Sequence, residues 1–397
     1  GLLIDSIGWQ WIFFINVPVG ILAIFLMVRI YKPENEQKDP NKAGRFDYVG
    51  LTLSMLGIVA LVYGFNQVSQ RDPGTVTATN PAGSIYGWGY WQVWAWVIAG
   101  VVLLAAFLVY ELRSKDPVVD LRLFKQRDFT TASIMTWAMR AFVFGSFFLL
   151  PVFLQEIRNP HLSATVAGLA TMPMGLASGV AVVLTGRKLY AALGPRYLVL
   201  LGVIFMAASN FLLLGITNET DGWSLIPAMI LRGIGFGMSG IPLQTVALEK
   251  LKGYELPRAS SLYNASAQIF SSIGIAVLTT LFVQQTTAHQ PSQQAIQALA
   301  QSTAQQMAPA YLASHPGLTQ AALQTTPDFT QQVQASVAAQ ATSRAGIPAM
   351  TDVFLVVTIA MVALVFLSLI LPDNRSRQSV GAAEGAESER SEPMLVE

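Results

Sequence analysis

The chain contains 397 residues, of which 53% are hydrophobic and only 12% are charged, and its formal net charge is +1. Soluble domains carry about 25% charged residues, so this composition excludes most soluble enzymes and disordered scaffolds. The near-zero net charge gives no reason to expect a nucleic-acid partner. There is no cysteine, and the three histidines lie far apart in the sequence, so we predict neither a disulfide nor a metal site, and no cofactor.

Nine apolar segments are long enough to cross a bilayer as helices, because a hydrocarbon core of about 30 Å needs about 20 apolar residues. One such segment is also typical of a buried core helix, but nine in succession predict an all-α polytopic membrane protein. In chain order the segments are residues 12–31, 47–67, 91–112, 129–155, 163–186, 196–217, 223–248, 259–284 and 352–371. Residues that favour helix N-caps stand at four of their starts: Asp47, Asp128, Ser163, and Thr351 or Asp352.

The basic residues predict the orientation of these segments, since cytoplasmic loops are enriched in Lys and Arg. We placed the loop after the first segment in the cytoplasm and alternated the loops from there. On this arrangement 19 of the 24 basic residues are cytoplasmic, three are on the outer side and two lie inside segments. We therefore expect the N-terminus of the chain on the outer side and the C-terminus in the cytoplasm.

Two polar regions stand apart from the apolar segments. Residues 285–350 are rich in Gln, Ala, Ser and Thr, and the composition of 293–313 and 318–342 favours helix. We expect a large, partly helical outer loop. Residues 372–397 are polar and rich in small side chains, which predicts a disordered cytoplasmic tail.

Charged residues inside or at the ends of the apolar segments are candidates for a substrate or proton pathway. A charge costs at least about 2.5 kcal/mol at the centre of a membrane helix, so it usually faces a bundle interior, a water-filled cavity or a partner. Arg140 and Arg232 lie about 16 and 13 Å into their segments at a rise of 1.5 Å per residue. The alternative for both is snorkelling or structural pairing. Glu156 ends its segment, and it is either a proton or cation site or a solvated helix end.

A run of glycines in the seventh segment predicts close helix packing. Gly233, Gly237 and Gly240 share one helix face, and a face of small residues lets a neighbouring backbone approach. Pro242 frees a carbonyl and suits a helix that rocks. Tight packing without motion is the alternative.

Asn264 and Gln268 lie four residues apart in the eighth segment and therefore share a helix face. Amides inside a membrane either bind substrate or form hydrogen bonds between helices. No Ser/His/Asp set, carboxylate pair or metal-ligand spacing occurs within the segments. We therefore predict a transporter and not an enzyme.

Several motifs together resemble one transporter family, the fourteen-helix drug:proton antiporters of the major facilitator superfamily. This is the EmrB/QacA-like branch, and the EmrB-like members are most similar. The motifs are WQWIFFINVPVG at 9–20, RFDYVGL at 45–51, DPVVDLRLFKQRDF at 116–129, LLPVFLQE at 149–156, AGLATMPMG at 167–175 and ASSLYN at 259–264.

The same resemblance extends to a basic loop. Gly186, Arg187 and Lys188, followed by Gly194 and Arg196, are similar to the C-half copy of the superfamily's basic cytoplasmic loop. This similarity implies a role in conformational change for these five residues, alongside Gly233, Gly237 and Pro242.

The resemblance implies proton-coupled antiport of small amphipathic drugs across the inner (cytoplasmic) membrane. Two six-helix halves would alternate around a midplane cavity. EmrB-like members work with a periplasmic membrane-fusion adaptor and an outer-membrane channel, and the outer loop at 285–350 fits such partners. The other expected partner is the lipid bilayer.

The resemblance also implies a partial major facilitator fold that lacks helices one to five. Residues 1–31 would end the N-terminal half as the sixth helix, 32–128 would hold two linker helices, and 129–371 would form a complete C-terminal half. Two alternatives remain at this point. One is an exporter of a specific metabolite such as a siderophore or an amino acid, and the other is a non-transporting scaffold if the chain is complete.

Overall fold

The computed structural model is helical throughout the part of the chain that it describes, with no strand in that part. The described residues are 2–8, 10–30, 47–70, 72, 86–113, 121–251, 255–315, 323 and 326–372. Eight of the described helices are long and apolar enough to cross a membrane. The predicted fold class, an all-α polytopic membrane protein, is therefore confirmed. All of the predicted tail at 372–397 except residue 372 lies outside the described residues.

The eight long helices follow the order of the predicted segments. They are α4 (Tyr48–Ser69), α5 (Trp91–Arg113), α6 (Arg127–Val152), α7 (Ala164–Leu184), α8 (Tyr190–Leu212), α9 (Ile226–Leu248), α10 (Glu255–Ala288) and α12 (Pro327–Ser368). π-Helical turns at Phe153–Ile157 and Thr185–Leu189, which are wider than α-helical turns, extend α6 and join α7 to α8.

The first predicted segment is the exception to this agreement. It contains α2 (Trp11–Phe14) and α3 (Asn16–Ile30), with a break at Ile15. At 1.5 Å per residue the 15 residues of α3 reach only about 22 Å. The prediction of nine spanning segments is thus confirmed for eight among the described residues. A short helix, α1 (Leu2–Ile7), precedes this segment and contacts α7.

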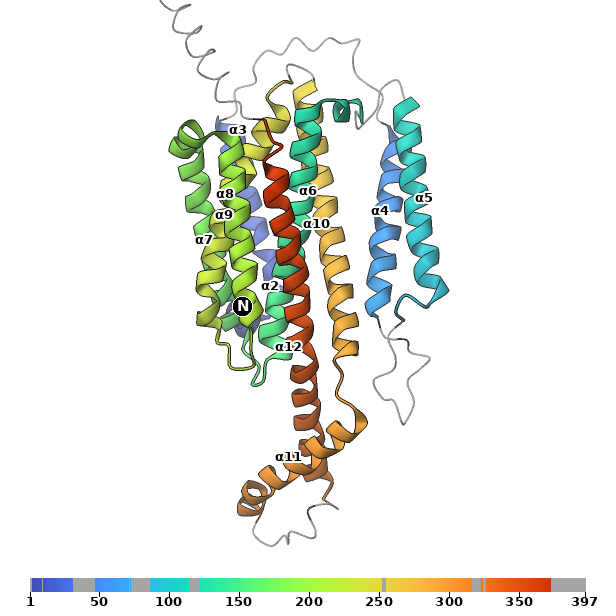
Figure 1. The fold of residues 1–397 in the computed structure, drawn as a ribbon, viewed down its shortest axis with the longest axis vertical. Helices are drawn as coiled ribbons and strands as arrows, with labels where there is room; N and C mark the ends of the chain where they lie inside the picture. The colour runs from blue at the N-terminus through green and yellow to red at the C-terminus, as the bar shows by residue number, and fades with distance from the viewer. Residues whose placement is uncertain are drawn as a thin grey trace, which may run out of the picture.

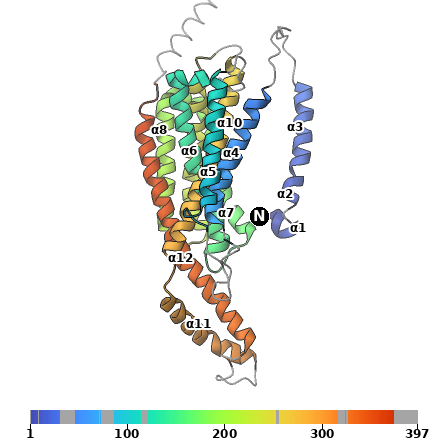
Figure 2. The same cartoon turned by 90° about the vertical axis from the view of Figure 1, so that its right-hand side faces the viewer.

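Six long helices form one bundle with a shared core (Figure 1). In it α9 packs along both α7 and α8, α6 packs along α10, and α12 packs against α8 and α10. Large side chains such as Phe129, Met229 and Phe354 are fully buried between them. The pair α4 and α5 lies beside α10, where the Thr280 hydroxyl donates a hydrogen bond of 3.2 Å to the carbonyl of Phe65. Figure 2 shows α3 standing apart from this bundle.

Glycines set the closest helix contacts because no side chain separates the backbones. A Cβ atom added at Gly274 of α10 would lie 2.2 Å from the carbonyl oxygen of Ala141 on α6. The same construction at Gly235 of α9 gives 2.4 Å to the carbonyl oxygen of Gly202 on α8. Real Cβ atoms do not approach this closely, so these positions require glycine.

The predicted outer loop is helical, but α12 begins earlier than predicted. α11 (Gln293–Ser314) and the first part of α12 form a hairpin beyond the bundle with a small core of its own around Leu299, Tyr311 and Phe329. Because α12 starts at Pro327, Thr351 and Asp352 lie inside it and cap nothing, so that prediction was wrong.

Of the other three residues predicted to cap helix N-termini, two do so and one does not. Asp47 and Ser163 accept hydrogen bonds from the backbone N–H groups of Gly50 and Val166. Asp128 lies one residue inside α6 and instead pairs with Lys250 at 2.5 Å. The competing cation explains why the Asp128 side chain is not at the cap.

Candidate functional site

The bundle encloses a partly polar cavity of about 180 Å³ between α6, α9 and α10, with one residue of α7 at its edge. Its polar wall includes Thr136, Arg140, Gln244 and Asn264. Its apolar and aromatic wall is made by Met139, Val182, Phe236, Ile241, Leu243 and Tyr263, with Gly240 between them. This cavity brings together Arg140 and Asn264, two of the five residues predicted for a substrate or proton pathway.

Arg140 is the one charged side chain in the wall of this cavity, and it is partly buried. No ion pair within the described part of the chain involves it. Asn264 is exposed on α10 and lines the cavity, and its Nδ2 donates a hydrogen bond of 2.8 Å to the carbonyl of Ser260. The cavity therefore offers a cation, an amide and an aromatic surface to a small molecule.

Hydrogen bonds between α6 and α10 hold the shape of this wall. The hydroxyls of Thr136 and Tyr263 lie 2.5 Å apart, and the indole of Trp137 donates to the Ser266 hydroxyl at 2.8 Å. Trp137 also stacks on Phe270 with ring centroids 4.6 Å apart. These contacts fix the relative rotation of the two helices that carry Arg140 and Asn264.

Arg232 does not line the cavity. Its side chain is fully buried between α9 and α8, and its Nη2 donates a 2.7 Å hydrogen bond to Oδ1 of Asn210. Among the described residues its Nε and Nη1 have no hydrogen-bond partner. The geometry is that of a cation buried in the bundle interior, which is one of the three environments predicted for it.

Glu156 and Gln268 are also outside the cavity. Glu156 is exposed in the π-helical turn that ends α6, sixteen residues from Arg140. Gln268 is exposed on α10, one turn beyond Asn264. A shared helix face with Asn264 was predicted, but only Asn264 reaches the cavity wall.

The glycines on one face of α9 have two roles: two of them contact α7 closely, and one borders the Arg140 cavity. Cβ atoms added at Gly233 and Gly237 would lie 2.2 and 2.5 Å from carbonyl oxygens of α7, so the predicted close approach exists there. Gly240 has no neighbour within 4 Å and instead borders the cavity. Pro242 is buried inside α9, which runs continuously through it.

The predicted basic loop is helical. Gly186 lies in the turn Thr185–Leu189, and the side chains of Arg187 and Lys188 lie outside the described atoms. Gly194 has φ 73°, a conformation that glycine adopts readily, and it kinks α8 just before Arg196. Arg196 lines a second polar cavity at the end of the bundle where α6 begins.

Sequence reasoning missed several residues of the site. Thr136 and Gln244 lie one turn from Arg140 and Gly240 respectively, and this i,i+4 spacing was a usable signal. Arg158 was counted only as a loop charge. It is buried and donates to the carbonyls of Thr220 and Pro160, and it also pairs with Asp221 at 3.0 Å, so it fastens two interhelical loops together.

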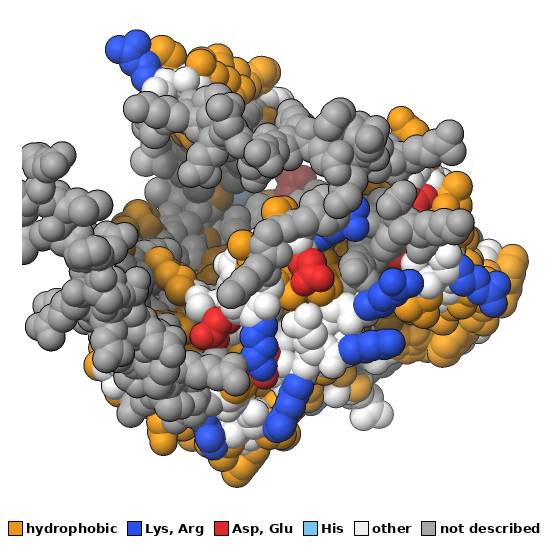
Figure 3. Space-filling view, turned by 90° about the horizontal axis from the view of Figure 1, so that it is seen from above, with side chains coloured by type: hydrophobic (Ala, Val, Ile, Leu, Met, Phe, Trp, Pro, Cys, Tyr) orange, Lys and Arg blue, Asp and Glu red, His pale blue; other side chains and the backbone are white. Residues whose placement is uncertain are grey.

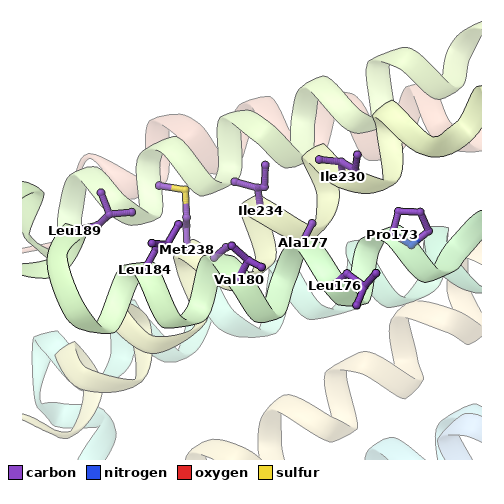
Figure 4. Close-up of a pocket in the computed structure, with 10 residues that line it drawn as sticks. Pro173, Leu176, Ala177, Val180, Leu184, Leu189, Ile230, Ile234 and Met238 are labelled. Carbon is purple, nitrogen blue, oxygen red and sulfur yellow. The ribbon is translucent and has the colours of Figure 1, made fainter.

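A larger groove of about 490 Å³ lies between α7 and α9, and Figure 4 shows its side chains. Leu176 and Val180 of α7 face Ile234 and Met238 of α9 across it. Its lining residues are all apolar. It has no polar group to orient a ligand, so we assign the candidate site to the Arg140 cavity.

The chain belongs to the major facilitator superfamily, whose family model matches residues 1–275. It is 30% identical over 288 residues to a "Multidrug resistance protein B homolog" of Mycobacterium tuberculosis, a match that covers 72% of this chain and 49% of the relative. It is 29% identical to "Lincomycin resistance protein LmrB" of Listeria monocytogenes, with 71% and 55% coverage. It is 31% identical to "Fatty acid resistance protein FarB" of Neisseria gonorrhoeae, with 71% and 52% coverage.

Two conclusions follow from these similarities. The chain is a membrane-embedded protein of a transporter family. The chain spans about half the length of the curated relatives that it matches.

Proposed function

We propose that this chain is part of a multidrug efflux transporter that moves amphipathic toxic compounds across the cytoplasmic membrane. The observation that best supports the proposal is the cavity that joins Arg140 and Asn264 to an apolar and aromatic wall. A few polar groups on a largely apolar surface are typical of small-molecule sites. The resistance functions in the names of three relatives point the same way.

The size of the cavity bears on how this chain contributes. Drug-sized ligands usually occupy pockets of about 300–1,000 Å³, whereas this one measures about 180 Å³. In major facilitators the substrate site lies between two six-helix halves. We infer that α6, α9 and α10 supply one wall of the transport cavity and that other segments of the protein supply the second.

The finer features of the transport cycle are part of the proposal. We propose proton-coupled antiport, with the α11 end on the outer side and the end where α6 begins in the cytoplasm. The support for this orientation is the predicted excess of Lys and Arg at the latter end. Gly233, Gly237 and Pro242 of α9 would allow that helix to move against α7 during alternating access.

A second class of substrate, anionic amphiphiles, has specific support. Among the described residues of the cavity wall, Arg140 is the one that is charged, and none of them is a carboxylate that would favour a cationic drug. One relative is named for fatty acid resistance. The carboxylate of a fatty acid would pair with Arg140, and its hydrocarbon chain would pack against Phe236.

The hairpin of α11 and α12 is the proposed contact for a periplasmic adaptor and, through it, an outer-membrane channel. Its exposed surface is rich in Gln and almost free of charge, which is compatible with hydrogen bonding to another helical protein. Loss of co-purification with an adaptor after deletion of residues 293–326 would support this contact.

Drug accumulation tests the proposed function. An efflux-deficient bacterial strain expressing the gene should accumulate less of a fluorescent amphiphile than the empty strain. Arg140→Gln should abolish most of the difference, whereas Arg113→Gln, which removes an exposed cation from α5 outside the cavity, should not. Equal accumulation with and without the gene, at confirmed membrane abundance, would refute the proposal.

A further inference from the structure

A second cavity, of about 400 Å³, lies at the end of the bundle where α6 begins and α12 ends. It is distinct from the proposed transport cavity and shares no residue with it. Its wall combines two arginines, Arg127 of α6 and Arg196 of α8, with residues 369–372, which directly follow α12. Figure 3 views the molecule from this end and shows Lys and Arg side chains gathered there, with hydrophobic side chains around the rim.

The cavity keeps a net positive charge when the ion pair between Asp128 and Lys250 is taken into account. Its one acidic residue, Asp128, is already neutralised by Lys250, whose Nζ lies 2.5 Å from Oδ2. None of the ion pairs within the described part of the chain involves Arg127 or Arg196. Two guanidinium groups on two different helices therefore share one cavity, and among the described residues neither has an acidic partner there.

The helix ends add to this positive potential. α6 begins at Arg127, and the straight part of α8 begins after the kink at Gly194. Helix N-termini carry a partial positive charge and favour anions. The C-terminus of α12 has the opposite sign, but its last carbonyls accept hydrogen bonds from the N–H groups of Leu369, Ile370 and Leu371. Two cations and two helix N-termini outweigh that one end.

The surface beside the cavity is apolar and exposed. The exposed fraction of Phe366 on α12 is 66%, and that of Ile370, just after α12, is 50%; those of Tyr197 and Ile204 on α8 are 43% and 42%. α8 and α12 pack against each other. Ile370 itself lines the cavity, and Tyr197 follows the lining residue Arg196 directly in the sequence. In a membrane-embedded protein such a surface contacts lipid chains.

We propose that this cavity binds the phosphate group of an anionic membrane phospholipid, with an acyl chain of that lipid along the exposed apolar side chains of α8 and α12. Arginine pairs with phosphate through two parallel hydrogen bonds, and basic pockets between membrane helices hold anionic lipid headgroups. The exposed apolar side chains near the cations favour a lipid over a free phosphate, because a free phosphate has no acyl chain to contact them.

Thermal unfolding of the purified chain in a neutral detergent tests the proposal. Phosphatidylglycerol should raise the unfolding midpoint, and phosphatidylcholine at the same concentration should raise it much less. Inorganic phosphate and glycerol 3-phosphate serve as soluble probes. An equal shift with those probes would show a free-anion site and overturn the lipid assignment.

Substitution of the cavity arginines tests whether the stabilisation by phosphatidylglycerol arises at this cavity. Arg127→Gln with Arg196→Gln should raise the half-saturating concentration of phosphatidylglycerol at least about tenfold, the change expected for about 1.4 kcal/mol of lost binding. The control pair Arg113→Gln with Lys125→Gln removes two exposed cations outside the cavity and should leave it unchanged. Equal responses of the two pairs, or equal effects of the two lipids on the unmodified chain, would contradict the proposal. If the double variant does not fold, the single variants and the lipid comparison decide.

Discussion

The pairing of Arg232 with Asn210 gives a prediction that separates structural stabilisation from transport. Arg232 is fully buried, and Asn210 is its one hydrogen-bond partner in the described part of the chain. A hydrogen bond to a charged group is worth about 1.5–3 kcal/mol, more than the roughly 0.6 kcal/mol average for neutral pairs between membrane helices. Asn210→Leu should therefore reduce the free energy of unfolding by about 2 kcal/mol, or roughly 30-fold in the folded-to-unfolded ratio.

The double variant supplies the control. Arg232→Met removes the buried charge, so Asn210→Leu with Arg232→Met should lie within about 1 kcal/mol of the unmodified chain, because replacing a buried polar pair by apolar side chains is often neutral. Titration from mild detergent into SDS, followed by circular dichroism, measures these free energies. If the two single costs simply add within about 0.5 kcal/mol, Asn210 is not the partner of Arg232 and the reasoning fails.

Three further predictions concern packing, the cavity and pH. Gly274→Val should reduce the free energy of unfolding by more than about 3 kcal/mol or prevent folding, because the new Cβ would meet the α6 backbone. Gly240→Ala should be nearly neutral in the same titration, because a Cβ added there has no atom of a neighbouring element within 4 Å. Asn264→Ala should change the pattern of drug resistance; a parallel fall for all drugs would argue against a binding role. Hydrogen bonding from Thr165 lowers the pKa of Asp5 below its usual 3.8. The contribution of this bond to the contact of α1 with α7 should therefore be full above that pH and decline as pH falls through the lowered pKa, which spin-label distances between the two helices would measure.

Hydrophobic length predicted the helices well because eight of the nine segments correspond to helices whose mean hydropathy and length suit a membrane span. It failed at the start of α12, where residues 327–351 are too polar to be recognised as part of a membrane helix yet have the Ala and Gln content that favours helix. Helix ends were harder still. Asp128 has the chemistry of a cap, but its pairing with Lys250, more than a hundred residues away, decides its position.

The candidate site could be predicted only in part, since a single helix pattern says nothing about its neighbours. Arg140 and Asn264 were both identified as polar residues at membrane depth, but their meeting in one cavity depends on how α6 packs against α10. Arg232 had the same sequence signal as Arg140 and faces a different helix, α8. The sequence indicates how deep in the membrane a polar residue lies, but it does not indicate which neighbouring helix the side chain faces.

The most direct test of the central claim is whether transported compounds occupy the Arg140 cavity. This chain has no cysteine, so Asn264→Cys introduces one thiol into the cavity wall, and Ser302→Cys places a control thiol on the exposed surface of α11. The rate of maleimide labelling should fall several-fold at Asn264→Cys in the presence of an amphipathic substrate and stay constant at Ser302→Cys. Labelling that is equally fast with and without substrate at both positions would contradict the assignment of this cavity to transport.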